Sequence, residues 1–390
     1  MSKKEIYLDN AATTKVAKEV LEEMIPYLKE KYGNASSLHK KGEEVKKTLE
    51  DAREIIAKSI NAKSSEIIFT SGGTESNNFA IKGLAFSYPD KKHIITTKIE
   101  HSSILNVCKW LEENFNYNIS YLDVDKEGFV NPLDLEKAIT KETLLFSCIH
   151  GNNEIGTIQN IEELGKICKK YNIFFHTDAC QSYTKVLIDV KKQNLDLVTL
   201  NSHKIHGPKG VGALYVKDGI RITPLLHGGG QEKNLRSSTE NIASIVGFAK
   251  ASQIITKKDI ERMSKLRDYF IEQIEKNIPN TKLNGPRGKN RLCNNINISF
   301  LGVEGESIVS SLNLYNIYVS TGSACSSNTL KPSHVLKAIN CSEEEIASAI
   351  RFSISKYTKK EEIDYTLKIL EKVIRSLRKI SPLTKFIEKK

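Results

Sequence analysis

The 390-residue sequence predicts an α/β fold, with a mostly parallel, helix-covered sheet of seven strands in a large domain and a smaller α+β domain after it. Two observations indicate this organisation. As far as Val216, short apolar runs of strand length alternate with helix-periodic stretches, which is typical of parallel sheets buried on both faces. After Thr239 this alternation ends, and a long helical stretch is followed by short strands and helices, which indicates a second domain.

The strands of the large domain are predicted from apolar runs at Glu66–Thr70, His93–Thr97, Ile119–Leu122, Thr143–Ile149, Ile173–Thr177, Leu197–Leu200 and Gly212–Val216. Helical periodicity lies between most of them, at Ser76–Phe86, Ser103–Asn114, Pro132–Ile139 and Ile161–Tyr171. The later part predicts a long helical stretch over Ile242–Asn277, strands at Asn295–Phe300, Ile317–Val319 and Ile350–Ser355, and helices at Glu304–Leu314 and Glu361–Lys379. We expect residues 15–258 to form the large domain, and residues 1–14 with 259–390 to form the small one.

A chain of this length, with 39% hydrophobic residues, can bury a large core without disulfides or metal ions. Its composition excludes a small disulfide-stapled scaffold, a collagen-like repeat and a mainly disordered chain. No stretch approaches the roughly 20 apolar residues of a membrane-spanning helix, and the N-terminus lacks the apolar segment of a secretory signal. We therefore expect a cytoplasmic protein with no membrane partner.

The seven cysteines are scattered and form no CxxC pair. This spacing argues against a disulfide framework and against a zinc site, so we expect a reducing cytosol and no metal. The net charge is +11, but the lysines lie on helix-like stretches that also carry glutamates, such as residues 40–58. A solvated basic surface explains them better than a nucleic-acid groove, so we expect no direct nucleic-acid partner. A weak contribution to docking acidic partners stays open.

Three segments at predicted strand ends carry candidate chemistry. In the first, residues 67–83, a strand runs into Ser-Gly-Gly-Thr and then into a helix. Gly73 lets backbone N–H groups approach an anion, the helix N-terminus adds partial positive charge, and Thr74 offers a hydroxyl. The segment can therefore cradle a phosphate, although it lacks the spacing of a nucleotide P-loop. Taken alone, it is explained better by a capped turn, in which Thr74 or Ser71 serves only the helix.

The second segment places Asp178 at the carboxyl end of a predicted strand, where open α/β sheets bind ligands. Taken alone, Asp178 is also explained as a helix cap. The third segment places Lys204 after a strand that ends in Asn-Ser-His-Lys, away from any charged helix face. A lysine there can form an imine with a carbonyl cofactor, whereas in isolation it is interpreted as a surface lysine. Cys180, in an apolar neighbourhood, is interpreted as a packed core thiol.

The three segments together are more specific than any one of them. They supply an anion site, a carboxylate and a lysine, in that order, on successive strand ends. Pyridoxal 5′-phosphate requires these three groups: one for its phosphate, one to keep its ring nitrogen protonated, and one to form the imine. The combination predicts an enzyme that uses this cofactor.

Further motifs extend along nearly the whole chain: 7-YLDNAATT-14, 32-YGNASSLH-39, 70-TSGGTESNN-78, 100-EHSSIL-105, 152-NNEIGTIQ-159, 176-HTDACQ-181, 203-HKIHGPKGVGALYV-216, 227-HGGGQEKNLRSSTEN-241, 323-SACSS-327 and 349-AIRFSISKYT-358. As a set they resemble the cysteine desulfurases of the NifS/IscS type, which are class V pyridoxal-phosphate enzymes. The resemblance implies the PLP-dependent transferase fold type I, a homodimer, and L-cysteine as substrate.

The resemblance also implies roles for individual residues. Lys204 is similar to the Schiff-base lysine, and Asp178 to the partner of the pyridine nitrogen. His101 resembles the histidine that stacks on the ring and moves protons. Gln181 is similar to the residue that bonds the phenolic oxygen of the cofactor. Arg351, with Asn153, resembles the groups that bind the substrate, because a guanidinium can clamp a carboxylate with two hydrogen bonds.

The remaining cofactor-binding residues are implied in the same way. Thr74 and His203 resemble phosphate ligands, with Gly73 in the turn of the cradle. Asn201 stands where the family usually has a serine that helps to bind phosphate; its amide can still donate, or Ser202 compensates. Thr239 resembles the threonine that reaches the phosphate of the neighbouring subunit. Other departures from the family pattern are Gly73 in place of alanine and Ser238 in place of glycine.

Cys325 lies in residues 319–334, a segment rich in serine, glycine and threonine. Such a composition predicts a mobile, exposed loop, and a thiol there can react as a thiolate nucleophile. The alternative is a free surface cysteine. The Ser-Ala-Cys-Ser-Ser context resembles the long-loop group of desulfurases, in which sulfur is made in the pocket and delivered at the surface.

The resemblance therefore implies that Lys204, His101 and Cys325 are catalytic, with alanine released and a persulfide left on Cys325. The acceptor of that sulfur is expected to be an iron–sulfur scaffold protein or a tRNA-thiolating enzyme. A class V aminotransferase or a selenocysteine lyase stays open as an alternative enzyme. A cofactor-free binding protein is a third hypothesis, for which Asn201 and Ser238 are the only hints.

Overall fold

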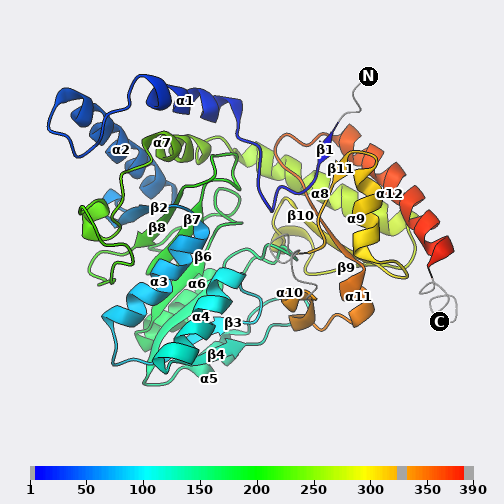
Figure 1. Ribbon diagram of the computed structural model, residues 1–390. Coiled ribbons are helices and arrows are strands. Elements are labelled where there is room, and N and C mark those ends of the chain that lie inside the picture. Colours follow the sequence, from blue (N-terminus) through cyan, green and yellow to red (C-terminus); the bar gives the residue numbers. More distant parts are fainter. Residues whose placement is uncertain (1–4, 323–331, 382–390) are drawn as a thin grey trace.

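A computed structural model describes residues 5–322 and 332–381 of the chain. The fold has a large helix-covered sheet on one side and two smaller sheets with their own helices on the other (Figure 1). The first strand, β1 (Ile6–Tyr7), and the last helix, α12 (Lys360–Ile380), both lie on the side of the smaller sheets (Figure 1). The two ends of the described chain therefore meet in the same part of the molecule.

The large sheet has seven strands, as predicted. Their spatial order is β2 (Ile67–Thr70), β8 (Gly212–Val216), β7 (Leu197–Asn201), β6 (Phe174–Asp178), β5 (Thr143–Ile149), β3 (His93–Thr97) and β4 (Asn118–Leu122). Only β8 runs antiparallel to its neighbours in this sheet, so the prediction of a mostly parallel sheet is confirmed. Consequently β2, β6 and β7 all end at the same edge, and the segments that follow them meet there.

The two faces of the large sheet are buried against different helices because successive strand side chains point in opposite directions. Leu145 and Leu197 pack with the helices α3 (Gly73–Ser87) and α4 (Ser102–Phe115). Their neighbours Phe146 and Val198 pack on the other face, which is covered by α2 (Lys40–Ser59), α5 (Pro132–Ala138), α6 (Ile161–Tyr171) and α7 (Ile242–Ala251). The helix α1 (Lys18–Lys29) packs on α7. Burial on both faces explains why the strands have near-continuous apolar runs.

The prediction of one long helical stretch over Ile242–Asn277 is wrong, because the structure has two helices there. The first, α7, ends at Ala251, and α8 (Lys257–Asn277) begins after a short turn. Thr256 and Asp259 form a capping box, in which each side chain accepts a hydrogen bond from the backbone N–H of the other residue. This reciprocal cap starts a new helix where the apolar periodicity alone continues.

The smaller part is built on an antiparallel sheet of β12 (Ala349–Ser353), β10 (Asn295–Phe300) and β9 (Thr281–Leu283). A parallel pair of two-residue strands, β1 and β11 (Ile317–Tyr318), lies beside it. The core of this part includes Phe270, Phe300 and Phe352, with α8, α9 (Gly305–Asn313) and α12 around it. Two short helices, α10 (His334–Ala338) and α11 (Glu343–Ala347), complete it. The expected division into residues 15–258 and residues 1–14 with 259–390 stays a prediction.

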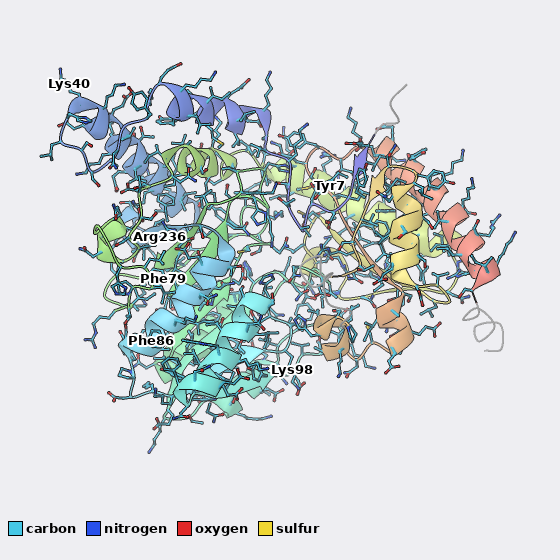
Figure 2. All side chains as sticks on the ribbon, viewed as in Figure 1. Tyr7, Lys40, Phe79, Phe86, Lys98 and Arg236 are labelled. Atoms are coloured by element: carbon cyan, nitrogen blue, oxygen red, sulfur yellow. The ribbon has the colours of Figure 1, made fainter. Side chains whose placement is uncertain are left out.

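The surface carries many charged side chains, spread over separate parts of the molecule (Figure 2). Lys40 at the start of α2 and Lys98 after β3 are both exposed and lie far apart in this view (Figure 2). Within residues 5–322 and 332–381, no helix combines the length and the apolar character needed to span a membrane.

Candidate active site

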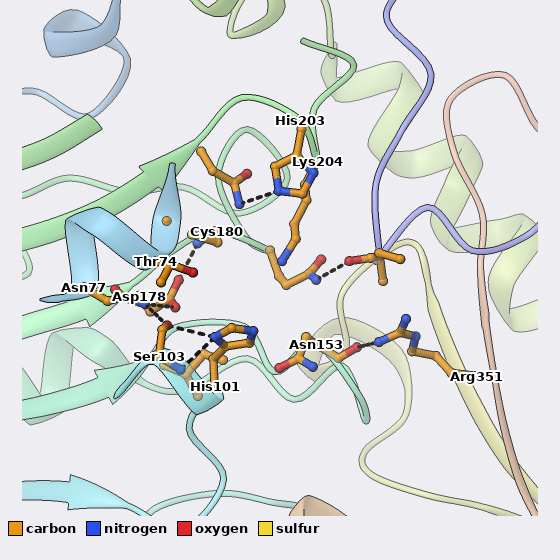
Figure 3. Close-up of a pocket in the computed structure, with 16 residues that line it drawn as sticks. Thr74, Asn77, His101, Ser103, Asn153, Asp178, Cys180, His203, Lys204 and Arg351 are labelled. Carbon is orange, nitrogen blue, oxygen red and sulfur yellow. Dashed lines mark hydrogen bonds between the residues drawn. The ribbon is translucent and has the colours of Figure 1, made fainter. Parts of the chain in front are cut away.

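A cavity of about 160 Å³ opens at the edge of the large sheet where β2, β6 and β7 end. In Figure 3, Asp178, His101 and Lys204 come from three different segments and surround the same space. Most of the residues predicted from the sequence line this cavity: Gly73, Thr74, His101, Asn153, Asp178, Gln181, Asn201, His203, Lys204 and Arg351.

Two predicted residues do not line the cavity, and a third lies outside the residues that the structure describes. Ser202 does not line the cavity, and its buried Oγ has no hydrogen-bond partner among the described residues. Thr239 is exposed, in the segment before α7, and also does not line the cavity. Cys325 lies outside the described residues. The roles expected for these three residues therefore stay predictions.

Asp178 is a buried carboxylate at the end of β6, and each of its two oxygens accepts a hydrogen bond. The Asn77 amide donates to Oδ2 (2.8 Å), and the Cys180 backbone N–H donates to Oδ1 (2.9 Å). Burial acts to raise the pKa of this carboxyl, but the nearby His101 and the two hydrogen bonds outweigh it and hold the pKa below its ordinary value. Asp178 is therefore ionised at neutral pH and presents a fixed negative charge to the cavity.

His101 is the N-cap of α4 and is held by its own helix. The backbone N–H of Ser103 donates to its Nδ1 (3.1 Å), so the neutral ring carries its proton on Nε2. Burial lowers the pKa of His101, and Lys204 adds to this effect while Asp178 opposes it. The ring is therefore neutral at pH 7. One imidazole nitrogen is fixed as an acceptor within the helix cap, and the other can exchange protons with a ligand in the cavity.

Two residues of this network were missed in the sequence reasoning. Asn77 donates to Asp178 and also to the Ser103 hydroxyl (2.8 Å), which in turn lies 2.8 Å from His101 Nδ1. Thus the carboxylate and the imidazole are joined through Asn77 and Ser103. A signal for both was present, since each is a polar residue near the N-terminus of a helix that follows a predicted strand.

The cradle before α3 is open to an anion. Gly72 is the N-cap of α3, and within residues 5–322 and 332–381 no side chain caps the first N–H groups of this helix. A Cβ at Gly73 would meet the Cys180 sulfur at 2.6 Å, while a Cβ at Gly72 would meet nothing within 4 Å. The helix N-terminus is therefore approachable from the side where Thr74 and Asn201 line the cavity.

Lys204 lines the cavity, and among the described residues no hydrogen bond or ion pair holds its amino group. Its neighbour His203 is held through Nδ1, which lies 3.2 Å from the Thr13 hydroxyl. Burial, with Lys204 adding to it, lowers the pKa of His203 to about 4, so its ring is neutral. Gln181 donates from Nε2 to the Ala11 carbonyl (2.9 Å), which closes the cavity with the N-terminal segment.

Arg351 lies across the cavity from the cradle and belongs to β12 of the smaller part. Its Nη1 donates to the Asn153 carbonyl (3.0 Å) and its Nη2 to Asp9 Oδ1 (2.9 Å), while the buried Nε has no partner among the described residues. Burial raises the pKa of Asp9, and Arg351 opposes this. The guanidinium is thus oriented by two neighbours and keeps donor capacity for a ligand carboxylate.

Comparison with known proteins places this arrangement in a family. The model of the family "Aminotransferase class-V" matches residues 6–366. The chain belongs to the class-V aminotransferases. Within that family it is 56% identical over 384 residues to the cysteine desulfurase IscS of Dictyoglomus turgidum, covering 97% of each chain. It is 48% identical to the cysteine desulfurase IscS of Methanosarcina thermophila, covering 98% of this chain and 95% of that protein.

Comparison with solved structures indicates the same family as these relatives. A NifS-like protein superimposes with a TM-score of 0.89 at 38% identity, over 96% of this chain and all (100%) of that one. A second structure, described as SspA in complex with cysteine, gives a TM-score of 0.82 at 39% identity, over 91% of this chain and 100% of that one. The fold expected from the resemblance is confirmed, and the chain is a cysteine desulfurase of the NifS/IscS type.

Proposed function

We propose that this desulfurase takes sulfur from L-cysteine with pyridoxal 5′-phosphate held in the cavity described above, releases alanine, and keeps the sulfur as a persulfide on Cys325. The observation that carries the proposal is the pairing, in one cavity, of an ionised buried carboxylate, Asp178, with a lysine amino group that has no partner among the described residues, Lys204. Relatives named cysteine desulfurase over 97% of the chain support the reaction.

The residues present fit this cofactor. The helix N-terminus beside Thr74 suits a phosphate, because no side chain in the described part of the chain caps its first N–H groups. Asn201 lines the same cavity, and the side-chain Nδ2 of this residue is a donor that suits a phosphate oxygen. The carboxylate of Asp178 suits a protonated ring nitrogen, and Lys204 suits the aldehyde. His101 would then face the cofactor ring, and Gln181 would face its phenolic oxygen.

When bound, pyridoxal 5′-phosphate supplies an electron-accepting ring next to the α-carbon of the substrate. Asp178 stays ionised in its hydrogen-bonded site and so favours a proton on the ring nitrogen. Lys204 is then free to take the α-proton of cysteine and to return a proton. The neutral His101, whose Nε2 is not committed to the helix cap, adjusts the protonation of the substrate thiol.

Arg351 and Asn153 orient the substrate. The carboxylate of cysteine accepts hydrogen bonds from the guanidinium, whose plane is already fixed by Asp9 and by the Asn153 carbonyl. A substrate held by Arg351 would lie in the same cavity as the Lys204 amino group.

Sulfur transfer requires a nucleophile, for which we propose Cys325. Its thiolate attacks the substrate sulfur, an S–S bond forms, and the Cβ–S bond breaks with its electron pair remaining on carbon. Protonation of that carbon fragment and its release give alanine. The product on the protein is a persulfide, which suits delivery to an iron–sulfur scaffold protein or a tRNA-thiolating enzyme. The exposed Thr239 suits contact with the cofactor phosphate of a second subunit in a homodimer. We place this enzyme in the cytoplasm.

A class V aminotransferase or a selenocysteine lyase is the second candidate, kept because the same cavity would serve either. The neighbouring structure described with cysteine favours a cysteine substrate.

The test is to incubate the cofactor-loaded protein with L-cysteine and a reductant, and to measure sulfide and alanine together. We expect equal amounts of the two products from the wild type and loss of both from Cys325→Ala. Wild-type release by Cys325→Ala would remove the role proposed for this thiol. Amino-group transfer to a keto acid without sulfide would favour the aminotransferase, and selenide release that survives Cys325→Ala would favour the lyase.

A further inference from the structure

Lys185 is a buried lysine directly behind the cavity, in the turn that follows β6. Its side chain is only slightly exposed, with a residue accessibility of 8%. Its amino group donates to two backbone carbonyls, that of Gln181 (2.8 Å) and that of Lys204 (3.3 Å). One partner therefore belongs to the segment that carries Asp178, and the other is the carbonyl of the cofactor-binding lysine itself.

This lysine has no acidic partner in the described part of the chain, where none of the salt bridges includes it. Burial lowers the pKa of its amino group to about 8; Cys293 opposes the shift and Lys204 adds to it. The amino group is thus still charged at neutral pH, although nothing neutralises it. A buried, uncompensated cation is unfavourable for folding, and an apolar side chain of the same length would fill this space without that penalty.

The charge of Lys185 reaches the residues of the cavity. Lys204 is one of the charges that lower the pKa of Lys185. The Lys185 cation contributes to the lowered pKa of His203, after burial, Lys204 and Lys209. The titratable groups within its field are Cys180, Cys293, His203, Lys204 and His206. The carboxylate of Asp178 faces the same cavity, so Lys185 and Asp178 contribute charges of opposite sign to its surroundings.

We propose that Lys185 is a positioning residue for Lys204: its amino group joins the Lys204 carbonyl to the Gln181 carbonyl, and it brings a positive charge next to the segment that would hold the cofactor. This inference rests on the proposed function, because it concerns the lysine that would hold pyridoxal 5′-phosphate. The two carbonyl contacts fix the separation of the loop after β7 from the turn after β6.

The experiment compares the wild type with Lys185→Met, which keeps the length and apolar stem of the side chain but removes its charge and donors. Each apo-protein is titrated with pyridoxal 5′-phosphate, and the visible absorbance of the loaded protein is followed from pH 6 to 10. We expect Lys185→Met to bind the cofactor about ten-fold more weakly. We expect its absorbance transition to move upward by at least about half a pH unit, because the opposing charge is gone.

The matched control is Lys356→Met. Lys356 is also poorly exposed and also donates to a backbone carbonyl, that of Ile254 (2.8 Å), but Ile254 does not line the cavity, and Glu19 lies 3.6 Å from the Lys356 amino group. Lys356→Met should leave both the cofactor affinity and the absorbance transition as in the wild type. A structural effect of losing any buried lysine would appear in both variants, whereas a shift of the absorbance transition should appear only in Lys185→Met.

A Lys185→Met variant with the affinity and transition of the wild type would overturn the inference while leaving the proposed function intact. A wild-type protein that takes up no cofactor would instead remove the proposed function. If Lys185→Met does not fold, the same titration of Lys185→Gln decides, because glutamine keeps a donor and removes the charge. An unshifted transition in Lys185→Gln would likewise contradict the electrostatic role.

Discussion

Replacement of Glu100 by glutamine should remove a loss of folding stability that the wild type undergoes as the pH rises. The Glu100 carboxyl is fully buried beside the cavity, and its Oε1 accepts hydrogen bonds from the Thr97 hydroxyl (2.6 Å) and the Ile149 N–H (2.8 Å). Its Oε2 has no partner among the described residues. Burial raises its pKa to about 8 from an ordinary 4.5; the two hydrogen bonds oppose the shift, and Asp178 adds to it.

The magnitude follows from this displacement. The pKa is raised in the folded protein, so the contribution of Glu100 to stability is fully present below pH 4.5 and is lost as the pH rises through about 8. A shift from 4.5 to about 8 is 3.5 pH units, and at 1.36 kcal/mol per unit the full loss is about 5 kcal/mol. Glutamine has nearly the same shape and cannot ionise, so Glu100→Gln should not show this loss.

The assay is urea unfolding of the cofactor-free protein between pH 5 and pH 9.5. We expect the free energy of unfolding of Glu100→Gln, relative to the wild type, to rise with pH by up to about 5 kcal/mol, with most of the rise below pH 8. The control is Glu113→Gln on the exposed face of α4, which should follow the wild type at every pH. A difference between Glu100→Gln and wild type that stays constant across this range would refute the argument that the buried carboxyl is protonated at neutral pH.

Three further predictions concern single contacts. Arg53 and Glu232 form a buried ion pair with two hydrogen bonds (2.7 and 2.8 Å). Arg53→Met should therefore lower the free energy of unfolding in urea by about 3–5 kcal/mol. The double variant Arg53→Met with Glu232→Gln should lower it less, because no buried charge is then left unpaired. Gly73→Ala places a Cβ 2.6 Å from the Cys180 sulfur, so we expect a loss of about 1–3 kcal/mol in thermal unfolding and weaker cofactor binding, both reduced by adding Cys180→Ala. Arg351→Ala should raise the KM for cysteine at least ten-fold in the sulfide assay; an unchanged KM would place the substrate carboxylate elsewhere.

The strands of the large sheet were predictable because both faces of the sheet are buried. Three of the predicted ranges, His93–Thr97, Thr143–Ile149 and Gly212–Val216, agree with the structure to the residue. The others differ by one residue at one or both ends. Their apolar runs are long and uninterrupted, and the helices between them end in left-handed asparagines such as Asn116 and Asn172.

The smaller part was harder to predict. The break between α7 and α8 depends on the reciprocal cap of Thr256 and Asp259, which apolar periodicity does not detect. The pairing of β1 with β11 joins two-residue strands from distant parts of the chain, so no local pattern marks it. Contacts of this kind are decided by tertiary packing.

A residue of the candidate site could be predicted individually only where it lies in a recognisable sequence motif. Asp178 and Lys204 stand at strand ends, and topology brings such ends together. Asn77 and Ser103 were missed because polar residues near the N-terminus of a helix usually serve the helix alone. The orientation of Arg351 by Asp9 was missed because the two residues are far apart in sequence and meet only through the fold.

The account depends most directly on Lys204 being the amine that holds the cofactor. The measurement is borohydride reduction of the protein loaded with pyridoxal 5′-phosphate, followed by digestion and mass spectrometry of the labelled peptide. We expect a yellow protein and one stable label, on the peptide that contains Lys204. A colourless protein that takes up no cofactor, or a label fixed on another lysine such as Lys185, would contradict the assignment of this cavity.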